Sequence, residues 1–270
     1  MGFKGSDMSK SAELYTMIEK FGLGAVILFD QDMVYHKPIH NISSPVQLQE
    51  LCASLHEVSS LPLWIGIDQE GGLVNRLKPI YGFPDTKSHA YLGNQDDIEL
   101  TYQQAKDIGR ILREMHITIN FAPVVDVAKE FNSSIIAKRE RSFGSSSDLV
   151  YRHAKAYLRG LQSEGIWGCC KHFPGHGSAT GDTHAGFVDV TDTWQEDELL
   201  PYSALIKDGL CSIIMTAHVI HRKFDAMHPA TISKYIIPKL LRKKMGFNGL
   251  VITDDMQMKA ISDHYGIKEA

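Results

Sequence analysis

The chain of 270 residues lacks the segments that would place a protein in or across a membrane. No apolar run approaches the ~20 residues of a membrane-spanning helix. The first residues, MGFKGSDMSK, contain no hydrophobic stretch like that of a signal peptide. These absences predict no membrane span and a cytoplasmic location, or a periplasmic one if a signal precedes this chain.

The chain also lacks an excess of basic charge and a cysteine framework. Lys and Arg number 28 against 32 Asp and Glu, a net charge of −4, so no nucleic-acid partner is expected, because nucleic-acid-binding surfaces are strongly basic. Four cysteines (Cys52, Cys169, Cys170 and Cys211) lie in apolar segments without metal-ligand spacing. We interpret them as buried thiols, typical of a reducing compartment.

Two nucleotide-binding motifs are missing as well. No G-x-G-x-x-G follows an apolar run, and no G-x-x-x-x-G-K-[ST] occurs. Nucleotide cofactors are therefore not expected.

What the chain does contain is a series of apolar runs, each followed by polar or charged residues. Continuous apolar runs of this length predict strands that are buried on both faces, as in a parallel sheet. The runs cover residues 24–29, 63–67, 117–125, 165–170, 211–215 and 249–253.

Helical patterns lie between these runs. Ser44 and Pro45 have the residue types of an N-cap and a first helical turn, and Gly22 stands where a helix C-cap belongs. The expected helices cover residues 14–21, 45–58, 96–115, 148–164, 195–209 and 233–245. Strands that alternate with helices indicate βαβ units.

We predict a single domain, residues 1–270, with a (β/α)8 TIM-type barrel fold. Polar residues follow every predicted strand, and a (β/α) barrel places its active site at the carboxyl ends of its strands. A doubly wound sheet is the alternative, but it would concentrate its site at one switch point. No internal repeat or low-complexity linker marks a domain boundary.

The segment Lys171–His184, KHFPGHGSATGDTH, carries the strongest functional signal. Pro174 and the glycines around it exclude a helix, so we predict a loop at the end of a strand. Its polar side chains, above all His172, Asp182 and His184, exceed the needs of a solvated turn. Loops on a rigid scaffold commonly carry chemistry.

Three further motifs follow predicted strands: Asp68-Gln69-Glu70-Gly71-Gly72 with Arg76, Glu140-Arg141-Ser142-Phe143-Gly144, and Asp254-Asp255. Asp68 could merely cap the next segment, and Arg76 or Arg141 could be surface residues. Asp254 is harder to explain structurally, because a carboxylate at a buried strand end is costly unless it is paired or used.

Together these motifs resemble family 3 of the glycoside hydrolases, and more narrowly its bacterial β-N-acetylglucosaminidase (β-hexosaminidase) branch, which trims cell-wall sugars. The resemblance covers essentially the whole chain. It is carried by IDQEGG, FAPVVDV, RSFG, KHFPGHG with D-x-H, and the TDD strand end, in the family's order. It implies a barrel, a retaining mechanism, a small carbohydrate substrate, no cofactor and no metal.

The resemblance also implies roles for particular residues. Asp254 matches the nucleophile, and His184 matches the acid/base, with Asp182 orienting or charging it. An imidazole suits this role because its unperturbed pKa lies near working pH. The positions that match sugar-binding residues are Asp68, Arg76, Arg141, Lys171 and His172. His176 and His218 are expected to support the architecture of the loop or the site.

The chain departs from the family pattern in a few places. Ser178 and Thr183 replace a usual Asp and a frequent Ser, and Glu140 replaces a common Asp. The resemblance further implies an incomplete barrel, with part of strand one and all of strand eight missing, and therefore open strand edges.

Other functions stay open at this point. A metal-dependent hydrolase could use His172, His176, Asp182 and His184 as ligands. A catalytically impaired barrel that only binds sugar is another alternative. The leaving group, phosphorolysis in place of hydrolysis, and β-glucosidase activity are also undecided, although the D-x-H motif disfavours the last. The oligomeric state cannot be predicted.

Overall fold

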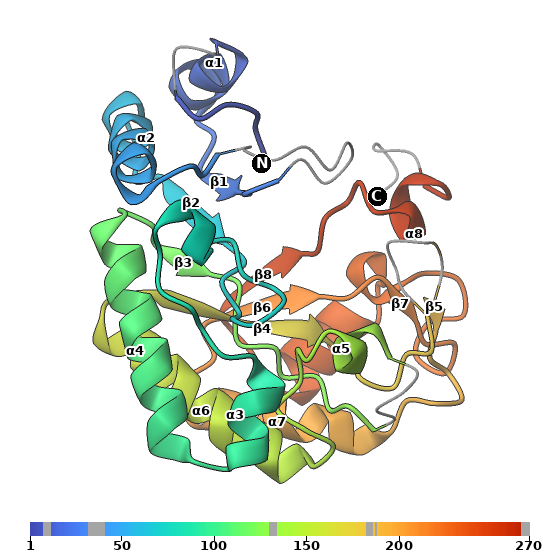
Figure 1. Ribbon diagram of the computed structural model, residues 1–270. Helices are drawn as coiled ribbons and strands as arrows, with labels where there is room; N and C mark the ends of the chain where they lie inside the picture. Colours follow the sequence, from blue (N-terminus) through green and yellow to red (C-terminus); the bar gives the residue numbers. More distant parts are fainter. Residues whose placement is uncertain (8–11, 32–40, 130–133, 182–185, 187, 266–270) are drawn as a thin grey trace.

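The computed structural model describes residues 1–7, 12–31, 41–129, 134–181, 186 and 188–265. Its centre is a curled parallel sheet of six strands (Figure 1). In sheet order these are β1 (Ala25–Leu28), β2 (Trp64–Ile67), β3 (Ile119–Asn120), β4 (Trp167–Phe173), β6 (Ile213–Thr216) and β8 (Leu250–Thr253).

The order of the strands distinguishes the two fold alternatives. Each strand pairs with the next one of the sheet in chain order, and every pair is parallel. A doubly wound sheet requires a reversal of strand order, which this sheet does not have. The fold is an incomplete TIM-type barrel, as predicted. Gly2 adds a parallel bridge to Ile27 beside β1, and no pairing joins β1 to β8 within the described residues.

Helices follow the strands and cover the outer side of the sheet (Figure 1). The α-helices are α1 (Ala12–Phe21), α2 (Pro45–Val58), α3 (His89–Gln95), α4 (Ile98–Glu114), α5 (Ile135–Lys138), α6 (Ser147–Ser163), α7 (Leu200–Lys207) and α8 (Lys259–Ser262). Short 3₁₀ turns are η2 (Pro79–Tyr81), η3 (Glu196–Leu199) and η4 (Ala230–Ile232), and η5 (Ile236–Lys244) is a π-helix.

The local signals for helix ends are confirmed. The Ser44 hydroxyl accepts from the Gln47 N–H at 3.2 Å, with Pro45 in the first turn of α2. Gly22, directly after α1, has φ +65°, the left-handed conformation that glycine adopts without strain. Caps of this kind are decided by neighbours in sequence, and so they can be predicted without knowing the fold.

Side chains alternate between the two faces of the sheet and form two cores. The larger core lies between the sheet and the helices, and includes Cys170 and Ile214. The smaller one lies inside the curl, where Cys169 packs with Ile119, Ile213 and Met215. Since Cys169 faces inward, Lys171, two positions later, does too. The alternation thus places the charged end of β4 at the mouth of the barrel. All four cysteines are buried free thiols, as predicted.

Some predicted boundaries were wrong. The strand expected over 117–125 is assigned only at Ile119–Asn120, because Pro123 has no N–H to donate to a ladder. The strand expected to end at Cys170 continues to Phe173, so Lys171 and His172 are strand residues and not loop residues. The helix expected over 195–209 is split into η3 and α7, and 233–245 contains a π-helix.

Two further features complete the fold. β5 (Val188–Asp189) and β7 (Val219–Ile220) form a small separate parallel pair. In the described part of the chain, no helix combines the length and the apolar character needed to cross a bilayer.

Candidate active site

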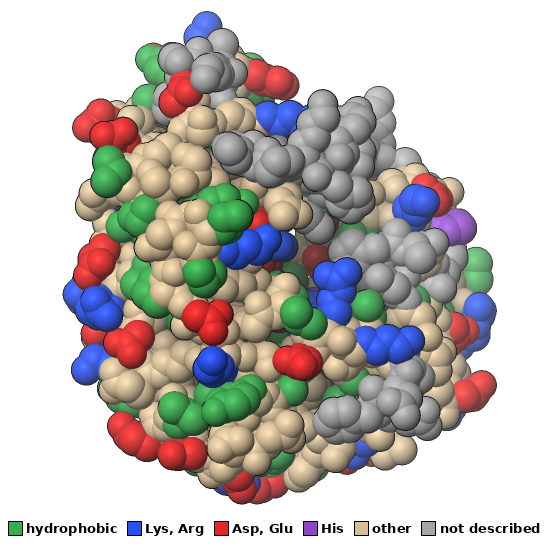
Figure 2. Space-filling model, viewed as in Figure 1, with side chains coloured by type: hydrophobic (Ala, Val, Ile, Leu, Met, Phe, Trp, Pro, Cys, Tyr) green, Lys and Arg blue, Asp and Glu red, His purple; other side chains and the backbone are tan. Residues whose placement is uncertain are grey.

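The predicted site residues that the structure describes lie at one end of the sheet, where the strands end. Asp68 follows β2, Lys171 and His172 end β4, and Asp254 follows β8. Arg141 enters from the loop before α6, and contacts residues of β4 and of the segment after β2. Basic side chains lie beside a hollow near the middle of the face shown in Figure 2.

A buried ion-pair network occupies the β2–β4 side of this end. Lys171 Nζ lies 2.7 Å from both Asp68 Oδ1 and Glu70 Oε1. Arg141 holds Glu70 through two parallel bonds, Nε to Oε2 at 2.9 Å and Nη2 to Oε1 at 2.8 Å. Lys171 and Glu70 are only 2% and 1% exposed. Such charges are tolerated in the interior because they neutralise each other with good geometry.

The network determines which groups in it are charged. Burial alone would raise the pKa of Glu70, but the positive charges of Arg141 and Lys171 outweigh burial and hold that pKa far below its usual range. Burial acts in the opposite direction on Arg141, where the charge of Glu70 prevails and raises the pKa. Glu70 is therefore an anion that is fully engaged by its partners.

His172 has a defined tautomer in this arrangement. Its Nδ1 lies 2.7 Å from Asp126 Oδ2, and its Nε2 lies 3.2 Å from Arg141 Nη2. Because arginine can only donate, Nε2 accepts from Arg141 in this arrangement and Nδ1–H donates to Asp126. Asp126 is fully buried and also accepts the backbone N–H groups of His172 and His176, at 3.1 and 2.8 Å.

Arg76 extends the charge network toward β1. Its two terminal nitrogens lie 3.7 Å from Asp68 Oδ2 and from Asp30 Oδ1. Asp30 is buried and also pairs with Lys78. The guanidinium carbon of Arg76 lies 5.6 Å from the centre of the Phe29 ring, within cation–π range. Arg76 and Asp68 are partly exposed, so a ligand in the mouth of the barrel could reach both.

Asp254, on the opposite side, has a different environment. It is half-buried, and its Oδ1 accepts the Asp255 N–H at 2.8 Å. It forms no ion pair with Lys or Arg among the described residues. Burial acts to raise its pKa, but the nearby basic side chains His172, His218 and Lys171 outweigh burial and lower it. Asp254 is thus an ionised carboxylate whose oxygens are not consumed by a salt bridge.

His218 supports the segment that carries Asp254. Its Nε2–H donates to the Asp255 carbonyl at 3.0 Å, and its Nδ1 lies 2.7 Å from the Thr231 hydroxyl. Burial lowers its pKa, against the charge of Asp254, which raises it. His218 is fully buried, which agrees with the supporting role expected from the sequence.

Comparisons with known proteins bear on what this arrangement is for. The family model for the N-terminal domain of glycosyl hydrolase family 3 matches residues 4–270. The chain belongs to glycosyl hydrolase family 3. The resemblance noted in the sequence is confirmed.

Several relatives of this family 3 chain are similar over most of its length. Beta-hexosaminidase A of Pseudoalteromonas piscicida is 33% identical over 275 residues, which cover 96% of this chain and 45% of that protein. A beta-hexosaminidase of Nitrosomonas eutropha is 36% identical over 255 residues, covering 91% of this chain and 68% of that protein.

Among solved structures, a family 3 beta-N-acetylglucosaminidase from Paenibacillus sp. str. FPU-7 is similar with a TM-score of 0.90 and 34% identity, over 99% of this chain and 49% of that one. The chain spans about half the length of the first curated relatives that it matches.

Two predicted catalytic residues cannot be placed. Asp182 and His184 lie outside the described residues. Within the described part of the chain, no three His, Cys, Asp or Glu side chains form a metal site. His172, one of the ligands of the metal-hydrolase alternative, has both ring nitrogens engaged. That alternative therefore has no support in the described geometry.

Three carboxylates buried at this end of the sheet, Glu70, Asp126 and Asp30, had no role predicted from the sequence. Each lies within three residues of the end of a predicted strand, and a buried carboxylate at a strand end indicates a paired or functional group. Their partners are far away in sequence: Glu70 and Arg141 are 71 positions apart, and Asp126 and His172 are 46 apart. The carboxylates at the strand ends could thus be recognised in the sequence, but the side chains that bind them could not.

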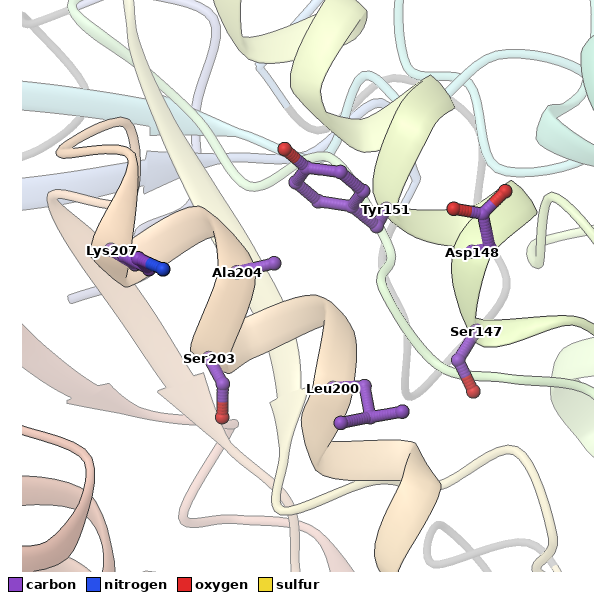
Figure 3. Close-up of a pocket in the computed structure, with 7 residues that line it drawn as sticks. All are labelled: Ser147, Asp148, Tyr151, Leu200, Ser203, Ala204 and Lys207. Carbon is purple, nitrogen blue, oxygen red and sulfur yellow. The ribbon is translucent and has the colours of Figure 1, made fainter.

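Another pocket lies on the outer surface, away from this site. It is lined by residues of α6 and α7 (Figure 3) and contains none of the predicted site residues. It is lined by Ser147, Asp148, Tyr151, Leu200, Ser203, Ala204 and Lys207.

Proposed function

We propose that this family 3 chain is the catalytic barrel of an exo-acting, retaining β-N-acetylglucosaminidase. It would remove terminal non-reducing N-acetylglucosamine, with peptidoglycan-derived sugars as the proposed source and the cytoplasm as the proposed location. The names of the relatives support the activity. The observation that carries the proposal is the contrast between two carboxylates. Glu70 is bound by both Arg141 and Lys171, whereas Asp254 is ionised and has no Lys or Arg partner among the described residues.

Asp254 is the proposed nucleophile. Its lowered pKa keeps it ionised at neutral pH, and an anionic carboxylate can attack the anomeric carbon to form a covalent glycosyl-enzyme. His184 is proposed to protonate the leaving oxygen and then to deprotonate the water that releases the sugar, with Asp182 orienting its ring. The configuration at the anomeric carbon is retained, because two displacements occur in sequence.

The β2–β4 side is the proposed sugar-binding side. Asp68 and Glu70 hold Lys171, and Arg141 is held by Glu70, so both cations are positioned before a ligand arrives. Donors that are already held in position lose less conformational entropy when they bind a hydroxyl or an amide carbonyl. Asp68, Arg76, Arg141, Lys171 and His172 are the proposed binding residues.

The test is turnover of an aryl N-acetyl-β-glucosaminide by the purified chain. Asp254→Asn is expected to lower kcat by at least ~10³-fold, the scale on which removal of one unit of the catalytic machinery acts. The matched control is Asp255→Asn, at the exposed neighbouring position, which keeps the oxygen that accepts the Gln257 N–H. A wild-type rate in Asp254→Asn excludes Asp254 as the nucleophile.

The acid/base role of His184 can be tested through the leaving group. Protonation is needed to expel an alkyl or sugar leaving group, but hardly for dinitrophenolate. His184→Ala should therefore slow a disaccharide far more than a dinitrophenyl glycoside, and azide should restore breakdown of the glycosyl-enzyme. If all substrates slow equally and azide has no effect, His184 only positions other groups.

A second candidate function is sugar binding without efficient turnover. It is favoured by one observation: β8, which precedes Asp254, pairs only with β6 within the described residues, and its residues are half-buried or exposed. A nucleophile that follows an edge strand is held less firmly than one in a closed barrel. N-acetylglucosamine binding without turnover in the wild-type chain would select this candidate.

A further inference from the structure

A buried carboxyl group that the proposed mechanism does not use lies beneath the segment after β4. Glu198, in η3, is fully buried. Its Oε1 accepts the Gln195 N–H at 3.3 Å, as part of a capping box. Its Oε2 has no hydrogen-bond partner of normal geometry among the described residues. An ionised carboxylate in this position would be costly, because burial removes water without replacing it.

Glu198 packs against the turn at residues 174–178. A Cβ atom added to Gly175 would lie 2.7 Å from Glu198 Oε2 and 3.1 Å from Trp194 Nε1, so only glycine fits there. Gly175 also has φ +127°, which disfavours any other residue. Trp194 Nε1–H donates to the Pro174 carbonyl at 3.1 Å. The buried Ser178 hydroxyl faces the same carboxyl group and is likewise without a partner of normal geometry among the described residues.

This turn is continuous with the predicted sugar-binding residues of β4. The Gly175 N–H donates to the His172 carbonyl at 2.9 Å. The His176 N–H donates to Asp126, the same carboxylate that fixes the His172 ring. A displacement of the turn where it packs against Glu198 would therefore shift His172, both through the backbone and through Asp126.

Burial opposes the ionisation of Glu198, and two neighbouring carboxylates add to its effect. Burial, with the negative charges of Asp126 and Asp197, raises the pKa of Glu198 to about 7, against a smaller lowering by Ser178 and the Gln195 N–H. Asp197 is itself paired with Lys129. Near neutral pH the carboxyl group thus converts from a neutral group into a buried anion near the carboxylates of Asp126 and Asp197.

We propose that Glu198 is a positioning residue that, while protonated, holds the 174–178 turn and thereby His172 in the sugar-binding arrangement, and that its ionisation loosens this turn and weakens sugar binding. The proposal rests on the proposed function, because sugar binding is its consequence. The displacement of the turn itself does not depend on any activity, and it can be measured separately.

The first test is the pH dependence of KM and kcat for an aryl N-acetyl-β-glucosaminide. If only the protonated form is binding-competent, KM rises by about tenfold from about pH 6 to about pH 8, with kcat changed less. Glu198→Gln, which is neutral at every pH, should remove this rise. Glu196→Gln, the same change on an exposed side chain of the same 3₁₀ turn, should keep it.

The second test reports on the turn without substrate. Trp194 contacts the turn directly, whereas Trp64 and Trp167 stack on each other at the opposite ends of β2 and β4. In a chain with Trp64→Phe and Trp167→Phe, Trp194 fluorescence should titrate with a midpoint near 7. His221 also faces the Trp194 ring, but burial lowers its pKa, so it titrates below this range.

A third variant covers the case in which Glu198→Gln does not fold. Ser178→Ala removes the hydroxyl that lowers the pKa of Glu198, so it should move the fluorescence midpoint upward. The proposal is overturned if Glu198→Gln leaves both the KM profile and the fluorescence titration unchanged, or if Ser178→Ala leaves the midpoint unchanged. A fluorescence titration that disappears in Glu198→Gln, in a chain without turnover, supports the proposal and contradicts the proposed glycosidase function.

Discussion

The two sides of the barrel mouth differ in how their carboxylates are neutralised. On the β2–β4 side, Glu70 makes three short contacts with Arg141 and Lys171 at an almost fully buried position. On the β8 side, Asp254 is half-buried and accepts one backbone N–H. Both carboxylates have lowered pKa values. The charges of the β2–β4 side therefore stabilise the structure, whereas the charge of Asp254 on the β8 side is available for chemistry.

The largest loss of stability is expected when Glu70 is changed. Glu70→Gln leaves Arg141 and Lys171 as buried cations without their shared partner, so we expect a loss of about 3–5 kcal/mol in the free energy of unfolding at neutral pH. Denaturant unfolding measures this loss. Asp254→Asn should leave the free energy of unfolding within about 1 kcal/mol of the wild type, because Asp254 has no salt bridge to the residues that the structure describes.

The pH dependence of this loss has a defined sign. Because the pKa of Glu70 is depressed in the folded protein, its stabilisation is present above the unfolded-state pKa of 4.5 and declines as the pH falls below it. The gap between wild type and Glu70→Gln should narrow on acidification. The exposed Glu57→Gln serves as control. Equal stability of wild type and Glu70→Gln at pH 7 would show that the network contributes nothing.

Arg141→Ala tests the role of the β2–β4 side in sugar binding. The variant removes two bonds to Glu70 and one to His172. Inhibition by N-acetylglucosamine should weaken by about 1.5–3 kcal/mol, the range for hydrogen bonds to charged groups. Arg139→Ala, at an exposed position two residues earlier, is the control. An unchanged inhibition constant would place Arg141 outside the sugar site.

Arg76→Gln should have the smallest effect on stability. Its ion pairs with Asp30 and Asp68 are 3.7 Å long and its own side chain is partly exposed. The buried Asp30 keeps Lys78 as a partner. We expect a loss below about 1 kcal/mol in the free energy of unfolding, with a larger effect of Lys78→Gln. Inhibition by N-acetylglucosamine should nevertheless weaken in Arg76→Gln. A stability loss greater than that of Lys78→Gln would contradict this order.

Local sequence signals predicted the fold well. The six apolar runs all became strands of one parallel sheet, and the Ser44 cap and the Gly22 helix end were placed correctly. Predicted boundaries were wrong where contacts between residues distant in sequence outweighed the local pattern of apolar and polar residues. Lys171 and His172 look like the start of a polar loop, but they continue β4, because the Asp68–Glu70 segment neutralises Lys171 and Asp126 binds His172.

The sequence by itself determined which residue types stand at the strand ends, because the period of a strand and the chemistry of a cap depend on near neighbours. Only the tertiary structure decided which carboxylate is consumed by cations and which stays available. Arg141 and Glu70 are 71 positions apart, and Lys171 and Asp68 are 103 apart. Coulomb energy and desolvation depend on distance and burial in space. The same reason applies to the orientation of the His172 ring and to the buried carboxyl group of Glu198, which no local pattern distinguishes from a solvated side chain.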